Sequence, residues 1–181
     1  MRKIIGISGS LRRQSLNAAL LHAAVELAPP GLSIEIGSIQ DIPLYNFDVE
    51  QSAYPAAVTA LKEQIVAADG LLLVTPEYNN SLPGVFKNAI DWLSRPPADA
   101  PRIFRQRPVG VIGASPGNFG TMLSQNAWLP VLRTLGTRPW FGSPIYVSQA
   151  AKVFDAEGKL IDATVREKLH KYLQGFAEFI G

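Results

Sequence analysis

Five short apolar runs alternate along the chain with five amphipathic stretches, and this alternation limits the possible folds more than any other feature. It is the pattern of a parallel sheet whose strands are joined by helices. The run from Gly70 to Val74 is apolar at consecutive positions, which indicates a central strand buried on both faces. We therefore expect an α/β fold with helices on both faces of the sheet. The expected strands are residues 3–8, 33–37, 70–75, 108–114 and 143–147, and the expected helices are residues 16–28, 55–68, 83–93, 120–135 and 162–180.

The linkers between these segments are short, so the 181 residues are expected to form one domain, residues 1–181. Residues 155–159 have the composition of a hairpin turn, and residues 151–154 and 160–161 are expected to form a small ribbon around it. The chain has no cysteine, which excludes disulfides and thiolate chemistry, so any redox activity requires a bound cofactor. His22 and His170 lie in separate expected helices without carboxylates at ligand spacing, so no metal site is predicted.

Charge and hydropathy restrict the possible partners of the chain. No apolar run is long enough to span a membrane, and the apolar part of the first residues is too short for a signal peptide, so we expect a cytoplasmic protein. The formal charge is only +2 and no basic stripe is interleaved with aromatic residues, which disfavours nucleic acid as a ligand. Small anionic ligands agree better with this composition.

The loop after the first strand, residues 8–17, is rich in hydroxyl side chains and has Arg12 in its middle. Free backbone N–H groups at a helix start attract anions, and a guanidinium can add paired hydrogen bonds to a phosphate. The loop matches neither the Rossmann glycine pattern nor the P-loop, because Gly9 has no partner glycines and no Gly-Lys-Ser/Thr follows. A monophosphate is therefore the expected ligand. The alternative is simple helix capping by Ser15 with Arg12 as a surface residue.

The loop after the third strand, residues 75–84, follows the most buried strand and lies at the same edge of the expected sheet. Pro76 and Pro83 stiffen it, while the segment from Glu77 to Asn79 gathers polar atoms where a flat ring could be held. Alternatively, Glu77 and Tyr78 are subunit contacts.

The loop after the fourth strand, residues 113–121, contains glycines that let a backbone approach a ligand closely. Residues 113–117 also satisfy the G-x-S-x-G pattern of an α/β-hydrolase nucleophile, with His170 downstream. A hydrolase needs a backbone N–H on the residue after the nucleophile to form the oxyanion hole, and Pro116 has none. The pocket-forming interpretation is therefore favoured, and the loop is expected to complete a three-sided pocket.

Taken together, the three loops resemble those of the NADPH-dependent FMN reductase family, a group of flavodoxin-like quinone, chromate and azo-dye reductases. The resemblance spans nearly the whole chain. Its motifs are Gly9-Ser10-Leu11-Arg12, the block from Thr75 to Asn79, the helical block from Lys87 to Trp92, and Ser115-Pro116-Gly117.

This resemblance implies a flavodoxin-like three-layer sandwich with a five-stranded parallel sheet in the order 2-1-3-4-5. It also implies bound FMN and assigns roles to residues of all three loops. The implied cofactor-binding residues are Ser10, Arg12, Ser15 and Asn17 at the phosphate with Leu16 beside them, Pro76, Glu77, Tyr78 and Asn79 beside the isoalloxazine ring, and Ser115, Pro116 and Gly117 with Gly120 at its other edge.

The implied activity is an FMN-dependent NAD(P)H oxidoreductase that passes electrons through the flavin to a small acceptor, such as free flavin, a quinone, chromate or an azo compound. No side-chain acid or base is required. NADPH is the favoured donor, because Arg12 and Arg13, or the cluster of arginines in residues 95–107, could hold its 2′-phosphate. The alternative is a flavodoxin-like electron carrier that does not itself oxidise NAD(P)H. Such carriers usually present an acidic docking face, and this chain is net basic.

Two departures from the family pattern concern the acceptor and the assembly. Asn80 stands where relatives often carry an aromatic residue or glycine, which leaves acceptor preference open. Leu123 and Ser124 replace a more polar pair in a helix that quinone-reducing relatives use for assembly. The resemblance implies a homodimer or homotetramer.

Overall fold

The computed structural model describes residues 1–181, and its centre is a parallel sheet with the strand order β2-β1-β3-β4-β5. A sixth strand, β6, also pairs with β4. All five residues of β3 are buried, as their unbroken apolar run predicts. The flavodoxin-like order is therefore confirmed. The strands are β1 (Arg2–Ser8), β2 (Leu32–Gly37), β3 (Gly70–Val74), β4 (Pro108–Ala114), β5 (Arg138–Pro139) and β6 (Tyr146–Val147).

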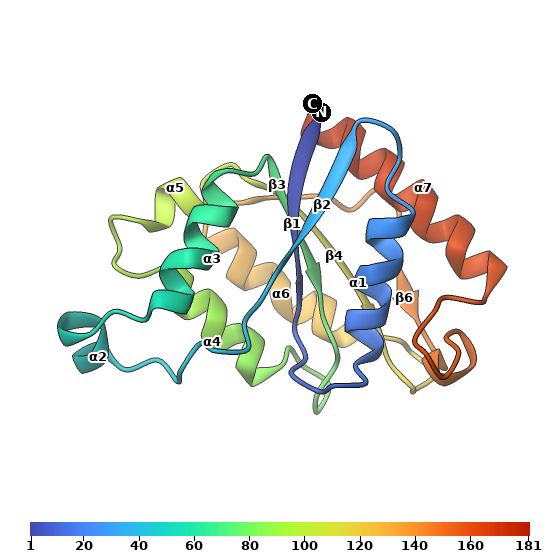
Figure 1. Cartoon of the computed structure of the whole chain (residues 1–181), viewed down its shortest axis with the longest axis horizontal. Helices are drawn as coiled ribbons and strands as arrows, with labels where there is room; N and C mark the ends of the chain where they lie inside the picture. Colours follow the sequence, from blue (N-terminus) through green and yellow to red (C-terminus); the bar gives the residue numbers. More distant parts are fainter.

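Helices cover both faces of the sheet, and each face has its own apolar core (Figure 1). One core packs α1 (Leu16–Glu26) and α7 (Ala163–Ile180) against the sheet, and the other packs α3 (Ala56–Val66), α4 (Gly84–Leu93) and α6 (Met122–Thr134). Trp92 and Trp128 are fully buried in the second core, as expected of packing residues. No helix combines the length and the apolar character needed to cross a membrane.

Two short helices were not predicted, α2 (Phe47–Ser52) and α5 (Ala100–Phe104), because one or two turns are too short to show a helical period. The segment containing α2 is fastened to the chain that follows α4. The buried Glu50 carboxylate accepts hydrogen bonds from Tyr45 Oη at 2.7 Å and Arg95 Nε at 3.1 Å. These bonds lower the pKa of Glu50, so its carboxylate stays charged where it is buried.

The fifth sheet position differs from the prediction, because two short strands share it. β5 pairs with the start of β4 and β6 pairs with its end, so the expected strand at residues 143–147 is reduced to β6. Pro139 and Pro144 cannot donate to a ladder. Between them, Trp140 packs its indole edge-on against Tyr172 of α7, with ring centroids 4.7 Å apart. The chain therefore leaves the sheet and returns.

The hairpin turn at residues 155–159 is confirmed, since Asp155 Oδ1 accepts from the backbone N–H groups of Glu157 and Lys159. The ribbon around it is smaller than expected. Phe154 and Leu160 form one antiparallel bridge, and Ala150–Lys152 instead forms a single 3-10 turn, η1.

Candidate functional site

The loops that follow β1, β3 and β4 lie side by side at the carboxyl edge of the sheet, the lower edge in Figure 1. Backbone hydrogen bonds continue past the strand ends and join the loops, from Gly9 N to Val74 O at 2.9 Å and from Thr75 N to Ile112 O at 2.8 Å. This edge is where ligands bind in open parallel sheets. The three loops singled out from the sequence therefore form one candidate site.

The loop after β1 presents unpaired backbone donors at the start of α1. Ser15 caps the helix, its Oγ accepting from Ala18 N at 3.2 Å, while the N–H groups of Ser15, Leu16 and Asn17 have no partner in the chain. At the base of the same loop, the buried Oγ of Ser8 also has no hydrogen-bond partner. Unpaired donors at a helix start and an orphaned hydroxyl fit a phosphate group, so the residues present suit the phosphate of FMN.

Arg12 is exposed and folded onto its own loop. Its Nε and Nη2 donate to the carbonyl oxygen of Gln14 at 3.0 and 2.6 Å, and its backbone N–H donates to Ser10 Oγ at 3.3 Å. Nη1 has no partner within the chain. The guanidinium is thus held beside the helix start with donors to spare. Ser10 and Arg12 lie together here, as the sequence predicts.

Asn17 has a structural role that the sequence did not reveal. Its amide is buried and forms a hydrogen-bond pair with the backbone of Ala114, donating from Nδ2 to the carbonyl oxygen and accepting at Oδ1 from the N–H, both at 2.9 Å. The start of α1 is therefore clamped to the end of β4. Its expected contact with a phosphate stays a prediction, with the backbone N–H as the free donor.

The loop after β3 is a tight hairpin. Tyr78 and Ser81 exchange backbone hydrogen bonds at 3.1 and 3.0 Å, and Asn79 and Asn80 between them have φ angles of 50° and 60°. Two successive left-handed residues define a type I′ turn, which asparagine tolerates better than most residues. The need for a residue that tolerates a left-handed backbone accounts for Asn80, at a position where relatives often carry an aromatic residue or glycine. The turn also holds Tyr78 half-exposed at the rim of the site.

Glu77 reaches across to the loop after β4. Its Oε2 accepts from the backbone N–H groups of Leu123 at 2.9 Å and Ser124 at 3.0 Å, in the first turn of α6. Thr121, the residue before this helix, makes no side-chain capping bond. A carboxylate from a loop 46 residues away therefore caps α6 and satisfies its positive end.

A second tie between these loops is completely buried. Thr75 Oγ1 lies 2.9 Å from Ser124 Oγ and accepts from Trp128 Nε1 at 3.1 Å. Gly113 packs directly against this tie, since a Cβ there would lie 2.1 Å from Thr75 O. The contact joins the ends of β3 and β4 to α6 without leaving a buried polar atom unpaired.

The loop after β4 closes the third side of the site. Ser115 Oγ accepts from Gly117 N at 3.1 Å, and Gly120, with a φ of 61°, packs directly on the backbone of Tyr146. Pro116 and Gly117 are exposed at the rim. The arrangement brings Ser115, Pro116, Gly117 and Gly120 to the edge where Pro76 and Tyr78 lie.

The hydrolase alternative lacks its histidine at this site. His170 Nδ1 lies 3.0 Å from the carbonyl oxygen of Leu27, at the end of α1 remote from the loops. Of the arginines in residues 95–107, Arg95 is paired with Glu50 of α2, and Arg107 lies at the opposite edge, because it directly precedes β4. That this cluster could hold a 2′-phosphate stays a prediction.

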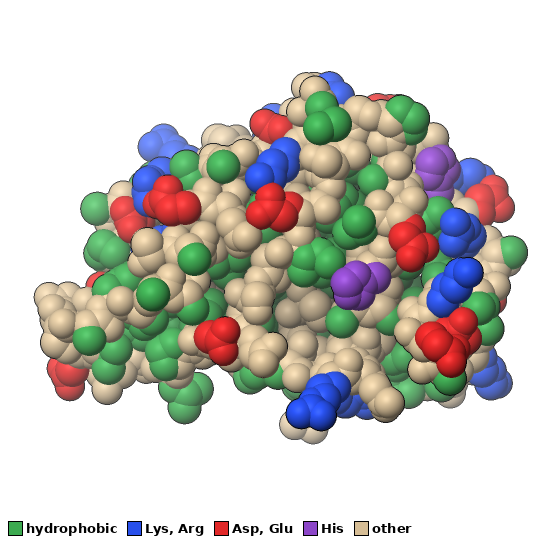
Figure 2. All heavy atoms as spheres, in the orientation of Figure 1, with side chains coloured by type: hydrophobic (Ala, Val, Ile, Leu, Met, Phe, Trp, Pro, Cys, Tyr) green, Lys and Arg blue, Asp and Glu red, His purple; other side chains and the backbone are tan.

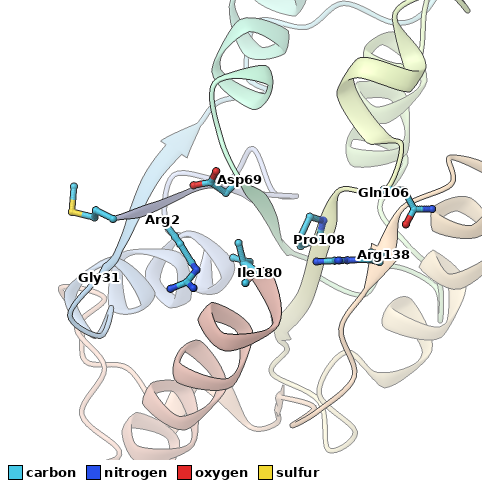
Figure 3. Close-up of a pocket in the computed structure, with 9 residues that line it drawn as sticks. Arg2, Gly31, Asp69, Gln106, Pro108, Arg138 and Ile180 are labelled. Atoms are coloured by element: carbon cyan, nitrogen blue, oxygen red, sulfur yellow. The ribbon is translucent and has the colours of Figure 1, made fainter.

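A hollow of about 680 Å³ lies at the amino edge of the sheet (Figure 3). Arg2 and Arg138 flank Ile180 there, and Asp69 accepts a hydrogen bond from the backbone of Lys3. The parallel strands begin at this edge, whereas ligands of open parallel sheets bind where the strands end. The hollow is therefore separate from the three-loop site.

The sheet order and the three-loop site define a flavodoxin-like nucleotide-binding protein. Comparison with known proteins agrees with this geometry. A model of the NADPH-dependent FMN reductase family matches residues 2–152. An NAD(P)H-dependent FMN reductase of Pseudomonas aeruginosa is 48% identical over 172 residues, covering 95% of this chain and 91% of that protein. A 2-hydroxy-1,4-benzoquinone reductase of a Burkholderia species is 38% identical, covering 98% of this chain and 96% of that protein.

Among solved structures, FerB of Paracoccus denitrificans, a flavoenzyme NAD(P)H:(acceptor) oxidoreductase, superposes with a TM-score of 0.89 at 34% identity. The match covers 99% of this chain and 97% of that one. The chain belongs to the NADPH-dependent FMN reductase family, as its three loops predict.

Sequence reasoning missed two features of the site. Ser8 was placed in the first loop but was not named as a ligand-binding residue, and residues 146–149, which border the loop after β4, were not expected to take part in the site. The local sign of that contact in the sequence is the glycine at position 120, whose left-handed backbone packs on Tyr146 in the structure.

Because Glu77 caps α6, Glu77→Ala is expected to lower the free energy of unfolding by about 1 kcal/mol, measured by urea denaturation. Glu77→Gln, which keeps one acceptor oxygen, should lose less. Glu157→Ala removes an exposed carboxylate without a hydrogen bond and serves as the control. Equal stability of Glu77→Ala and the wild type would contradict the capping role.

Proposed function

We propose that this chain is an FMN-dependent NAD(P)H oxidoreductase that passes electrons to a small acceptor of the quinone or flavin class. The observation that carries the proposal is the set of unpaired backbone donors at the start of α1, beside Arg12 and facing two rigid loops. Bound FMN would supply the redox chemistry, because the chain has no cysteine to do so.

The residues of the three loops would each contribute to holding the cofactor. Ser10, Arg12 and the N–H groups of Ser15 to Asn17 would bind the phosphate. The hairpin from Pro76 to Asn79 and the loop from Ser115 to Gly120 would hold the two sides of the ring. In this assignment Glu77 contributes by fixing the two loops relative to each other, since its carboxylate is already engaged.

The electron-carrier alternative receives less support from the surface. The face in Figure 2 carries Lys and Arg side chains interspersed with Asp and Glu, rather than an acidic patch. The relatives named above as reductases also favour an enzyme with its own NAD(P)H oxidation. Chromate and azo compounds as acceptors, and a cytoplasmic location, stay predictions.

The test is a visible absorbance spectrum of the protein after reconstitution with FMN and desalting, followed by anaerobic NADPH or NADH. We expect a retained flavin band that NADPH bleaches, because the donor reduces the bound cofactor. A retained band that neither nucleotide bleaches would favour the electron carrier. Loss of the band on desalting would mean that the pocket serves another ligand.

Arg12→Ala is expected to weaken FMN binding by about tenfold, because it removes a charged donor from the phosphate, and to leave riboflavin binding unchanged. Fluorescence titration of the two flavins measures both affinities. Arg13→Ala removes a neighbouring exposed guanidinium that makes no hydrogen bond and is the matched control. Equal losses for FMN and riboflavin would show that Arg12 does not act on the phosphate.

We further propose that the chain forms a homodimer or homotetramer through the start of α6. Phe119, Met122 and Leu123 follow one another closely there and are 74%, 40% and 43% exposed. Apolar side chains gathered on one surface beside a functional site are typical of an interface.

A paired change of Phe119→Asp and Leu123→Asp is expected to dissociate the oligomer, because it places four carboxylates in each two-fold contact. Light scattering on a size-exclusion column measures the mass. Ile161→Asp, at a 59% exposed position on the hairpin beyond η1, is the control. A wild-type mass of 19.6 kDa would contradict the proposal.

A further inference from the structure

A second cavity, of about 540 Å³, adjoins the loop after β4 and lies outside the pocket formed by the three loops. It lies between β6, η1 and the first turn of α7. Its volume is within the range of sites for small organic ligands. Residues that give it chemical character are Tyr146, Ser148, Lys152, Thr164, Val165 and Lys168.

A chain of hydrogen bonds connects this cavity to the candidate flavin site. Lys152 Nζ donates to Gln149 Oε1 at 2.9 Å, and Gln149 Nε2 donates to Asn118 Oδ1 at 3.2 Å. The backbone N–H of Gln149 also donates to the carbonyl oxygen of Gly117 at 2.9 Å. The cavity and the loop that would cover the flavin are therefore neighbours.

Gln149 adopts a conformation that its side chain does not favour. Its φ of 47° and ψ of 40° are left-handed, although it is not a glycine or an asparagine. Such strain persists where surrounding contacts enforce it and is concentrated at ligand sites. Here the left-handed backbone of Gln149 places its side chain between Lys152 of the cavity and Asn118 of the loop after β4.

The lining combines a cationic end with aromatic and aliphatic surface. Lys152 and Lys168 are exposed, make no salt bridge, and are accompanied by the hydroxyl groups of Ser148 and Thr164. Tyr146 is 38% exposed and offers a ring for stacking. The one acidic residue in the lining, Asp162, uses Oδ1 to cap α7 by accepting from Val165 N at 2.8 Å.

Three of the arginines considered for a phosphate are engaged elsewhere. Arg95 is paired with Glu50, and Arg102 with Glu63 at 2.8 Å. All three side-chain nitrogens of Arg107 donate to backbone carbonyl oxygens. Lys152 and Lys168, by contrast, make no salt bridge, so their charges are available to an anion in this cavity.

We propose that this cavity takes the adenosine 2′-phosphate end of NADPH, with Lys152 and Lys168 on the 2′-phosphate and Tyr146 against the adenine. The inference rests on the proposed function, because it assigns the donor specificity of that same site. A 2′-phosphate is absent from NADH, so the two lysines would discriminate between the donors by charge.

The kinetic test uses the FMN-loaded protein and compares NADPH with NADH. In the double variant Lys152→Ala/Lys168→Ala, we expect kcat/KM for NADPH to fall by about tenfold or more, through KM, with NADH unchanged. Lys171→Ala removes a lysine one turn further along α7 that is paired with Glu167, and it should change neither value.

A binding measurement separates this proposal from the proposed function. Calorimetry should show that adenosine 2′,5′-bisphosphate binds the wild type more tightly than adenosine 5′-monophosphate, and that the double variant loses this preference. Tyr146→Leu should weaken both ligands alike, because stacking does not depend on the phosphate.

Each outcome decides one of the two proposals. Oxidation of both nucleotides with an NADPH/NADH ratio unaltered in the double variant would overturn the cavity assignment and leave the reductase function standing. If neither nucleotide reduces the flavin, the proposed function is overturned. The calorimetric preference for the 2′-phosphate then decides by itself whether the cavity binds that group. A wild type that shows no preference for the 2′-phosphate overturns the assignment.

Discussion

The parallel direction of β1, β3 and β4 is the constraint on which the rest of the structure depends. Strands that run the same way end at the same edge, so three loops separated by many residues become neighbours. The helices that return the chain must then cover both faces, which accounts for the two apolar cores. The position of the three-loop site follows from that arrangement.

Polar contacts, two of them buried, then hold the three loops in one geometry. The Asn17 amide joins the start of α1 to the end of β4, Thr75 joins β3 to α6, and Glu77 caps α6 from the opposite loop. Each contact supplies a hydrogen-bond partner to polar groups that would otherwise be unsatisfied, either in the core or at a helix end. A pocket whose walls are fixed in this way loses little conformational entropy when a ligand binds.

Much of this fold could be predicted because its signals are local. The apolar runs located four strands closely, and the three loops were recognised from their glycines, prolines and hydroxyl residues. Tertiary contacts were beyond reach: nothing near Glu77 in the sequence indicates that its partners are Leu123 and Ser124. The short α2 and α5 lack a period to detect, and the divided fifth strand depends on where Trp140 packs.

The divided fifth position also affects how the molecule meets its own copies. A long unpaired strand at the rim of a sheet offers a row of free N–H and C=O groups to any second chain, which invites aggregation. Here β5 and β6 each contribute two residues, separated by a stretch that contains Pro144. The rim is too short and interrupted to act as a template, so this side of the sheet resists growth by strand addition.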